Sequence, residues 1–402
     1  MPNESFDDLT RRGLLTAGAG IALGSMLPAN APNAERSNVY DMLGVRYVIN
    51  AGGTFTNLGG SLMPPEVAAA WVEASKHFIP LGELQDKIGE RLAKRIGVEA
   101  AMVTTGAAGA LQLAAAAVLT QGDPKKIARL PDATGMRNEI LIQKSHQSCY
   151  DNRFAAVGAK VIVVETAEDI KKALSDRTAL MFFMNHAEPD GRIKRAEWVA
   201  LAQAAKVTTL IDAAADVPPI ERFTEYLKMG FDLAAFSGGK ALRGPNDTGL
   251  LLGRKTIIDA AKKNTNPNCG TIGRALKVGK EDMVALLVAV ERFLKLDHDA
   301  ERKEWERRIG ILEKMLAEVP TLKAKRITPA IANHVPHLNL TWDETRIKVT
   351  PAEITKALAA GDPPIIIARV HGSGDQGILI SVFVLQEGET EIVGRRLLEL
   401  LR

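Results

Sequence analysis

Lys240 closes a short glycine-rich turn, and it is the residue of this sequence best suited to covalent chemistry. The turn reads Phe-Ser-Gly-Gly-Lys over residues 236–240 and follows an apolar stretch typical of a buried strand. A lysine amine that is shielded from water holds its proton less tightly and can attack a carbonyl carbon. The same residue could instead lie in a solvated loop, so the motif needs partners elsewhere in the chain.

Asp212 is the first such partner. Residues 207–211 read Val-Thr-Thr-Leu-Ile and predict a buried strand that ends at Asp212. In an open α/β sheet the carboxyl ends of the strands form the edge where ligands bind. A carboxylate at that edge can keep the ring nitrogen of a flat cofactor protonated. The alternative role for an aspartate after a strand is to cap a helix, and we assign that role to Asp216.

A second candidate site lies between a predicted strand at 100–103 and a predicted Ala- and Leu-rich helix at 111–119. The small residues Thr105, Gly106 and Ala107 stand at this junction. They allow the free N–H groups of the first helical turn to approach an anion such as a phosphate. The spacing matches neither the dinucleotide fingerprint nor the P-loop, and close packing is the competing explanation. Ser237 could add a hydroxyl to the same anion site.

In this order, the motifs resemble those of fold type I pyridoxal-phosphate enzymes, in the branch of bacterial selenocysteine synthase and D-glucosaminate-6-phosphate ammonia-lyase. The matching stretches are residues 48–54, 58–66, 83–85, 104–108, 211–219 and 237–245. The resemblance implies an α/β fold, with a mostly parallel seven-stranded sheet in a large domain and a smaller α+β C-terminal domain. It also implies pyridoxal 5'-phosphate on Lys240, with Asp212 at the ring nitrogen and Thr105, Gly106, Ala107 and Ser237 around the phosphate.

Further site residues follow from the same resemblance. His146 falls where the family places a group that stacks on the cofactor ring, although a loop histidine bonded to backbone is the alternative. Asn185 and His186 follow the apolar strand 179–184 and should face the same crevice, where they would contact cofactor or substrate. Arg369 ends the strand-like run 364–368 and is predicted to bind the substrate's carboxylate bidentately. A surface arginine at a strand end is the competing interpretation.

The reaction that the resemblance implies begins with removal of the substrate's Cα proton by Lys240. We expect β-elimination, which makes the protein a deaminating lyase for a small amino acid or amino-sugar acid. Racemisation and transamination remain alternatives, and an exported binding protein that has lost catalysis is an alternative of another class. Because sites of this family are usually built at a dimer interface, the resemblance also implies a homodimer or a larger homo-oligomer.

The composition is that of a large soluble enzyme. The chain has 402 residues, 46% of them hydrophobic and 25% charged, which is enough to bury two cores. A net charge of +3 and the interspersed acids and bases of residues 301–308 argue against a nucleic-acid partner. Cys149 and Cys269 have no metal-ligand spacing. We interpret His334 and His337, on either side of a proline, as structural and predict no metal site.

Helical and strand patterns alternate along the chain, which predicts a mostly parallel sheet covered by helices. We expect strands at 139–143, 161–164, 179–184, 208–211 and 249–252, and helices at 83–96, 106–119, 196–205 and 389–401. One long helix is predicted from residue 281 toward 316. The expected domains are an N-terminal arm with a first small-domain segment (32–75), a large cofactor-binding domain (76–285) and a C-terminal small domain (286–402).

Residues 1–31 predict a twin-arginine export signal. Arg11 and Arg12 precede a moderately apolar stretch, and Ala29-Asn30-Ala31 offers a small-x-small cleavage site. The stretch is too short and too rich in Gly and Ala for a membrane span, which needs about 20 strongly apolar residues. The alternative is an arginine pair that precedes an ordinary helix by chance. The prediction is therefore a periplasmic or secreted protein.

Export by this route predicts a mature chain that begins at Pro32, because cleavage would follow Ala31. N-terminal sequencing of secreted material measures this directly. Secreted protein that still carried Arg11 and Arg12 would contradict the assignment.

Overall fold

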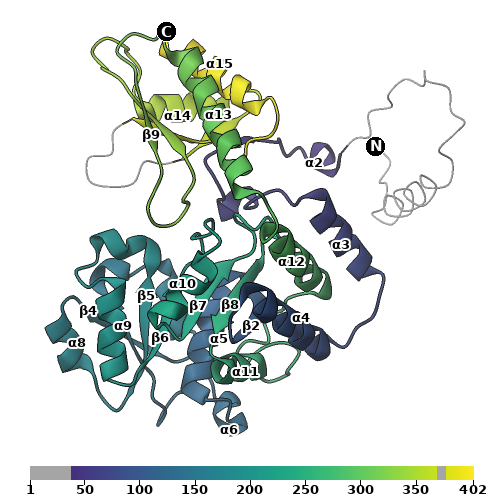
Figure 1. Ribbon diagram of the computed structural model, residues 1–402, viewed down its shortest axis with the longest axis vertical. Coiled ribbons are helices and arrows are strands. Elements are labelled where there is room, and N and C mark those ends of the chain that lie inside the picture. Colours follow the sequence, from purple (N-terminus) through teal and green to yellow (C-terminus); the bar gives the residue numbers. More distant parts are fainter. Residues whose placement is uncertain (1–37, 369–376) are drawn as a thin grey trace, which may run out of the picture. The chain divides into compact units, whose positions relative to one another are not determined.

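The computed structural model describes residues 38–368 and 377–402 (Figure 1). The predicted export signal and Arg369 lie outside the described residues. The chain divides into two compact units, one ending at Tyr47 and the other running from Val48 to Arg402. The described part of the first unit contains helix α2 (Val39–Met42), which Asn38 caps by accepting the Tyr40 N–H. Among the described residues, no helix is long and apolar enough to cross a membrane.

A seven-stranded sheet forms the centre of the second unit, in the order β2-β8-β7-β6-β5-β3-β4. Strand β8 runs antiparallel to both of its neighbours, whereas the remaining pairs are parallel. The strands are β2 (Ala100–Thr105), β3 (Glu139–Gln143), β4 (Lys160–Val164), β5 (Thr178–Met184), β6 (Thr208–Asp212), β7 (Leu233–Ser237) and β8 (Thr248–Gly253). The predicted fold class, a mostly parallel sheet in an α/β domain, is confirmed.

Both faces of this sheet are buried. In β5, Leu180 and Phe182 belong to one core, and Met181 and Phe183 belong to the other. Because successive side chains of a strand point to opposite faces, a strand covered on both sides needs an unbroken apolar run. The run Ala-Leu-Met-Phe-Phe-Met, residues 179–184, meets that need, and every residue of β5 is buried.

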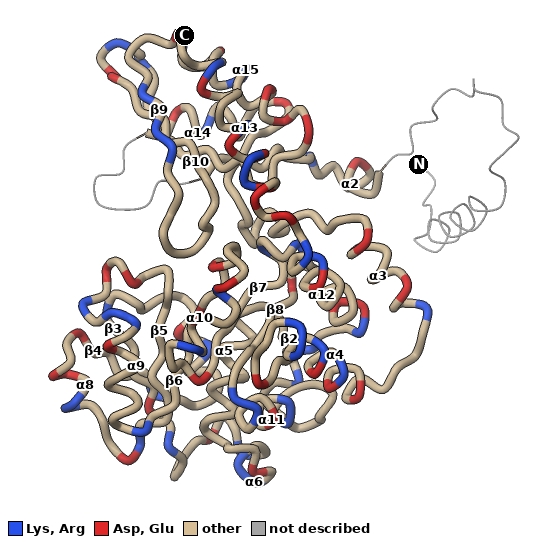
Figure 2. The backbone as a smooth tube through the Cα atoms, in the orientation of Figure 1, with Lys and Arg blue, Asp and Glu red and all other residues tan. Residues whose placement is uncertain are grey.

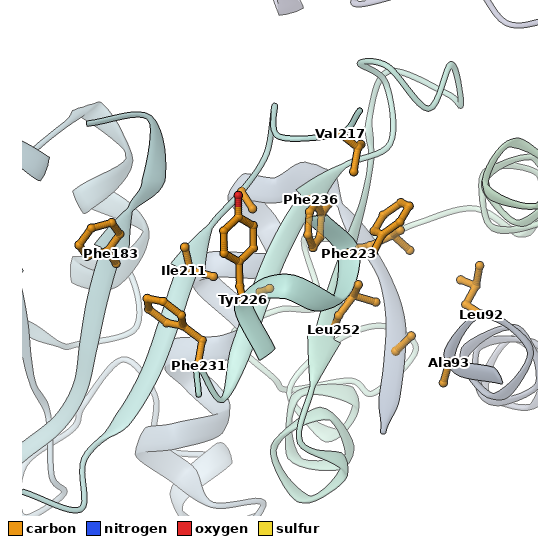
Figure 3. Packing of buried hydrophobic residues seen from close by; sticks show 14 of the residues in the cluster. Leu92, Ala93, Phe183, Ile211, Val217, Phe223, Tyr226, Phe231, Phe236 and Leu252 are labelled. Atoms are coloured by element: carbon orange, nitrogen blue, oxygen red, sulfur yellow. The ribbon is translucent and has the colours of Figure 1, made fainter. Parts of the chain in front are cut away.

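The helices that cover the sheet contribute one core on each face. Helices α5 (Gly106–Thr120) and α11 (Lys255–Lys263) supply one core. The other core is built with α4 (Leu81–Ile96), α9 (Arg195–Ala204), α10 (Arg222–Met229) and α12 (Lys280–Phe293). Figure 3 shows part of that second core, in which Tyr226 lies beside Ile211 with its hydroxyl oxygen directed away from Phe231. Alternating helices and strands thus follow the predicted order closely.

Two smaller sheets are built from strands near the start and near the C-terminal end of the second unit. Strand β1 (Ile49–Ala51) pairs in parallel with β11 (Ile365–Ile367). Strands β9 (Lys323–Ile327), β10 (His337–Thr341) and β12 (Ile378–Ser381) form an antiparallel sheet. Strands β1, β10, β11 and β12 share a core with α13 (His298–Leu316), α14 (Pro351–Ala360) and α15 (Glu389–Leu401). The predicted α+β character of the C-terminal region is confirmed.

The prediction of one long helix from residue 281 toward 316 is wrong. Helix α12 ends at Phe293, and α13 begins at His298. The side chain of Asp297 accepts the N–H of Ala300 and so caps the second helix. A capping aspartate satisfies a free N–H at a new helix start, and therefore it favours a break at this point.

Charged residues of both signs are interspersed along the described chain (Figure 2). In α13, Glu304 forms ion pairs with Arg307 and Arg308, which lie three and four residues further along the helix. The other α-helices of the described chain are α3 (Pro65–Ser75), α6 (Pro124–Ile127), α7 (Asn152–Ala155) and α8 (Ala167–Ala173).

Candidate functional site

The strand order brings most of the predicted site residues to one edge of the sheet. Because β2 and β7 are both antiparallel to β8, they are parallel to each other, and their carboxyl ends lie at the same edge as that of β6. Thr105 pairs with Thr248, and Ser237 pairs with Gly249, so both flank the start of β8. Asp212 ends β6 on the other side of β7.

An anion site is available where β2 passes directly into α5. Thr105 is the N-cap residue of α5, but its side chain caps no N–H, and its Oγ1 is buried without a hydrogen-bond partner. Gly106 has a φ of +63°, and a Cβ on Gly249 would lie 2.3 Å from the Gly106 carbonyl carbon. Two glycines thus permit this close approach of helix and strand. The free N–H groups of the first turn and the unpaired hydroxyl fit a phosphate.

The side chains of Lys240 and Asp212 form the charged centre of the site. Asp212 is buried, and its Oδ1 accepts the Ala214 N–H at 2.9 Å. Burial raises the pKa of Asp212, although this hydrogen bond and the nearby Lys240 and His186 act in the opposite direction. Burial lowers the pKa of Lys240, and the negative charges of Asp212 and Asp216 oppose that change. The amine therefore loses its proton more readily than a solvated lysine does.

The backbone that carries Lys240 is held in place by a segment far away in the sequence. The hydroxyl of Ser61 lies 2.9 Å from the Gly239 carbonyl oxygen and 2.8 Å from that of Lys240. Next to it, a Cβ on Gly60 would lie 2.5 Å from the Gly239 oxygen. Sequence reasoning gave Ser61 no role, although the residue stands in one of the stretches that carry the family resemblance.

Asp216 does not cap a helix, so that prediction is wrong. The next helix, α10, begins at Arg222 with Glu221 as its N-cap residue. Asp216 is instead 3% exposed, and its Oδ2 accepts hydrogen bonds from Asn185 Nδ2 at 2.5 Å and from the Tyr226 hydroxyl at 2.8 Å. Burial raises the pKa of Asp216 to about 6, against the effect of these two donors.

Asn185 and His186 follow β5 at the same edge of the sheet. Asn185 is fully buried, and its amide nitrogen also lies 2.9 Å from the Tyr226 hydroxyl, while its Oδ1 has no hydrogen-bond partner. His186 is exposed, and its charge acts on Asp212. Contact of either residue with a substrate stays a prediction.

His146 is fully buried behind the end of β5. Its ring meets the ring of Phe183 edge to face, with 4.4 Å between the centroids, and its Nδ1 accepts the Met184 N–H at 3.2 Å. Burial lowers the pKa of His146 to about 4, so the imidazole is neutral at pH 7. Its predicted stacking on the cofactor ring stays a prediction.

Tyr150 is a site residue that sequence reasoning missed. It is exposed, yet it lies close enough to Asp212 for that carboxylate to add to the effect of burial in raising the pKa of its phenol. The sequence offered one indication of this role, because Tyr150 lies four residues after His146, which was already a candidate site residue. The neighbouring Cys149 and the distant Cys269 are free and exposed.

The histidines interpreted as structural make local contacts to the backbone. His334 Nδ1 lies 2.6 Å from the Pro329 carbonyl oxygen, and His337 Nδ1 lies 2.7 Å from that of Val335. Within the described part of the chain, no group of three or more His, Cys, Asp or Glu side chains is arranged to hold a metal ion.

Comparison with known proteins gives consistent relatives. The model of the aminotransferase class-V family matches residues 83–272. A D-glucosaminate-6-phosphate ammonia lyase of Salmonella typhimurium is 32% identical over 267 residues, which cover 64% of this chain and 70% of that protein. A 5'-C-glycyluridine monooxygenase-decarboxylase of a Streptomyces species is 28% identical over 388 residues, covering 92% of this chain and 95% of its own.

A solved structure of D-glucosaminate-6-phosphate ammonia-lyase superimposes with a TM-score of 0.77 at 26% sequence identity. The match covers 90% of this chain and 98% of that one. The similarity therefore includes both the large sheet and the smaller C-terminal layer. The family resemblance predicted from the sequence motifs is confirmed.

The raised pKa of Asp216 predicts a specific pH dependence of stability. The folded state holds the Asp216 proton up to about pH 6, whereas an unfolded chain releases it near pH 3.8, the ordinary pKa of an aspartate. Stability from this group is therefore complete below pH 3.8 and is lost as the pH rises through 6, by about 3 kcal/mol in total. Urea unfolding of wild type and Asp216→Asn should show the variant gaining relative stability between about pH 4 and pH 7. Parallel pH profiles would contradict this.

Proposed function

The chain belongs to the aminotransferase class-V family of fold type I pyridoxal-phosphate enzymes, and we propose that it is a carbon–nitrogen lyase. Its substrate would be a hydroxylated amino acid or an amino-sugar acid. The observation that carries the proposal is the partly buried Lys240 side chain near Asp212, at the sheet edge that also holds the start of α5. The 32% identity to an ammonia lyase supports this choice of reaction.

The residues present fit pyridoxal phosphate. Lys240 would hold it covalently, and Asp212 would bind the protonated ring nitrogen. The N–H groups at the start of α5, with the unpaired Thr105 hydroxyl and Ser237, would bind the phosphate. The Thr105 hydroxyl is buried without a hydrogen-bond partner, and a bound anion would supply that partner.

Bound pyridoxal phosphate supplies an electron-withdrawing ring that accepts the electron pair left when a bond to Cα breaks. The Lys240 amine is placed to take the Cα proton, because burial favours its neutral form. The Ala214 N–H and the nearby Lys240 and His186 favour the ionised form of Asp212 against the effect of burial, and an ionised Asp212 would keep a proton on the ring nitrogen. The proposed elimination breaks the substrate's Cα–H and Cβ–oxygen bonds, and the proton taken by Lys240 would leave with the hydroxyl group as water. The resulting enamine gains a proton on Cβ to become an imine, and hydrolysis of this imine yields an oxo acid and ammonia.

The phosphate ester of the Salmonella relative's substrate is not part of this proposal. The sequence also supports export through the signal at 1–31, and an exported enzyme would meet little sugar phosphate. Racemisation and transamination use the same first proton transfer and remain alternatives, as does decarboxylating chemistry of the kind named for the Streptomyces relative, which matches 92% of this chain. An exported binding protein without catalysis is the alternative of another class.

Assembly into a homodimer or larger oligomer is supported by exposed apolar side chains. The segment around α3 leaves several of them in solvent: Leu62 is 67% exposed, Val72 53%, Phe78 103% and Ile79 45%. Monomeric proteins rarely leave such a group of apolar side chains in solvent without a function, and protein contacts are a common one.

Light scattering after size exclusion tests this assembly. We expect at least a dimer at micromolar concentration, and Phe78→Asp should weaken it because a charge would be buried in an apolar contact. Asp259→Asn, an exposed change on α11, serves as the control that should leave the mass unaltered. A wild-type monomer would contradict the proposal.

Lys240 provides the direct test of the cofactor and the reaction. Purified protein should absorb visible light, bleach on borohydride treatment and carry the pyridoxyl group on Lys240 in peptide mass maps. Lys240→Ala should lose this label and roughly a thousandfold or more of its turnover, while Lys255→Ala, at an exposed lysine on α11, should keep both.

The products then distinguish the reactions. Release of ammonia from hydroxylated amino acids or amino-sugar acids in single incubations supports the lyase. Exchange of the Cα proton alone indicates a racemase, and transfer of the amine to an oxo acid indicates a transaminase. Protein that stays colourless after incubation with pyridoxal phosphate would contradict the enzyme and favour the binding protein.

A further inference from the structure

A second carboxyl group, that of Asp216, lies near enough to Lys240 and Asp212 for their charges to act on one another. Its Oδ2 accepts two hydrogen bonds, at 2.5 Å from Asn185 and at 2.8 Å from Tyr226. The donors come from different elements, since Asn185 begins the turn after β5 and Tyr226 lies on α10. Because two donors bind the same carboxyl oxygen, Asp216 has a fixed position, and its charge acts on neighbouring groups from constant distances.

The donors are themselves held. The Asn185 amide also lies 2.9 Å from the Tyr226 hydroxyl, and Arg222 Nη1 lies 3.2 Å from the same hydroxyl. Arg195 and Arg222 both lie over the ring of Tyr226, with their guanidinium carbons 5.7 Å and 6.0 Å from its centroid. The three side chains Asp216, Asn185 and Tyr226 are each buried, so this group is a buried hydrogen-bonded cluster.

The electrostatic surroundings connect this cluster with the reactive amine. The charge of Asp216 acts on Lys240 in the sense that retains the amine's proton, and the charge of Asp212 acts on Asp216 in the sense that retains its proton. The titratable and charged groups around the cluster are Asp212 on β6, Lys240 after β7, Tyr226 and Arg222 on α10, Arg195 on α9 with its partner Glu188, Glu225 beside Arg222, and His186 after β5.

We propose that Asp216, held by Asn185 and Tyr226, is a positioning residue that sets the pH at which the Lys240 amine becomes a nucleophile. The inference deepens the proposed function, because it assumes that the Lys240 amine is the group that reacts. An ionised Asp216 stabilises the Lys240 ammonium, and a protonated Asp216 no longer provides this stabilisation. Two buried carboxyl groups next to one lysine thus let the site hold one negative charge or two, according to the state of Asp216.

Such a carboxyl group has a use in the proposed chemistry. Lys240 must be neutral to attack a carbonyl and to take the Cα proton, and it must carry a proton afterwards. A neighbour that can itself be neutral or charged near neutral pH favours each of these states in turn, whereas a permanently ionised one would favour only the ammonium. Asp212 has a separate task, because its charge is required at the ring nitrogen.

The test measures the amine itself and needs no turnover. The full-length chain is stripped of cofactor with hydroxylamine and trace-labelled with acetic anhydride across a pH series. Peptide mass spectrometry then gives the labelling midpoint of Lys240 relative to the exposed Lys255. In Asp216→Asn, the midpoint of Lys240 should fall by about one pH unit, because a nearby negative charge that favours the ammonium is lost.

Asp232→Asn is the matched control. Asp232 precedes β7 at the opposite edge of the sheet, where it is also largely buried, accepts the Thr209 N–H at 2.7 Å and pairs with Arg254 at 2.8 Å. Its loss should leave the Lys240 midpoint unchanged. If Asp216→Asn leaves the midpoint in place, or if both variants move it equally, the inference is overturned.

Tyr226→Phe decides the question where Asp216→Asn does not fold. Removing the hydroxyl takes one donor from Asp216 Oδ2 and disfavours its ionised form, so the Lys240 midpoint should move in the same direction by a smaller amount. An unchanged midpoint in Tyr226→Phe overturns the inference in that case. A wild-type protein that takes the pyridoxyl group on Lys240 while these variants show no shift would leave the proposed function standing and remove only the role of Asp216.

Discussion

The constraint on which the site depends is the cost of burying charge at the end of a sheet. A carboxylate or an ammonium loses its hydration when it is buried, and it remains charged only where hydrogen bonds or opposite charges replace the water. The charges of Asp212 and Lys240 each favour the charged form of the other residue. The Ala214 N–H also donates a hydrogen bond to Asp212. Burial moves the pKa of each group in the direction that favours its neutral form, and the opposite charge of the other group acts against that change.

The fold makes that arrangement possible because the buried sheet is parallel apart from one strand. Three of its strands, β2, β6 and β7, end at the same edge, and each delivers part of the site there. The single antiparallel strand, β8, separates β2 from β7 and begins with Thr248 and Gly249, which pair with Thr105 and Ser237. Because β8 is reversed, it begins at the edge where β2 and β7 end, and Thr105 and Ser237 therefore flank its first residues.

Much of this could be predicted from the sequence. Local patterns were sufficient for β3 and α15, whose bounds agree residue for residue with the prediction, and for the placement of Asp212 at a strand end. The helix break at 294–297 was missed because the residues on both sides of it favour a helix, while a single capping aspartate decides the outcome. Propensity and pattern are weak where one hydrogen bond is decisive.

The role of Asp216 was out of reach for a different reason. Its partners Asn185 and Tyr226 are 31 and 10 residues away, and nothing in the local sequence shows that three polar side chains meet in one buried cluster. An aspartate followed by two prolines suggests a cap or a turn, which is a local explanation. Only the tertiary structure, which places the turn after β5 and helix α10 against the loop after β6, shows the cluster.

The same loop is also held by the C-terminal part of the chain. The Ala215 carbonyl oxygen accepts the Asn333 N–H at 2.7 Å. Arg222 donates from Nη2 to the Ala330 oxygen at 3.2 Å and from Nη1 to the Tyr226 hydroxyl. Ala332 and Asn333 both have positive φ, so this contact requires a backbone that most residues avoid. A loop fixed at both sides cannot shift without disturbing Asp216 or Arg222. The position of Asp216 is therefore determined jointly by the sheet, by α10 and by residues 330–333.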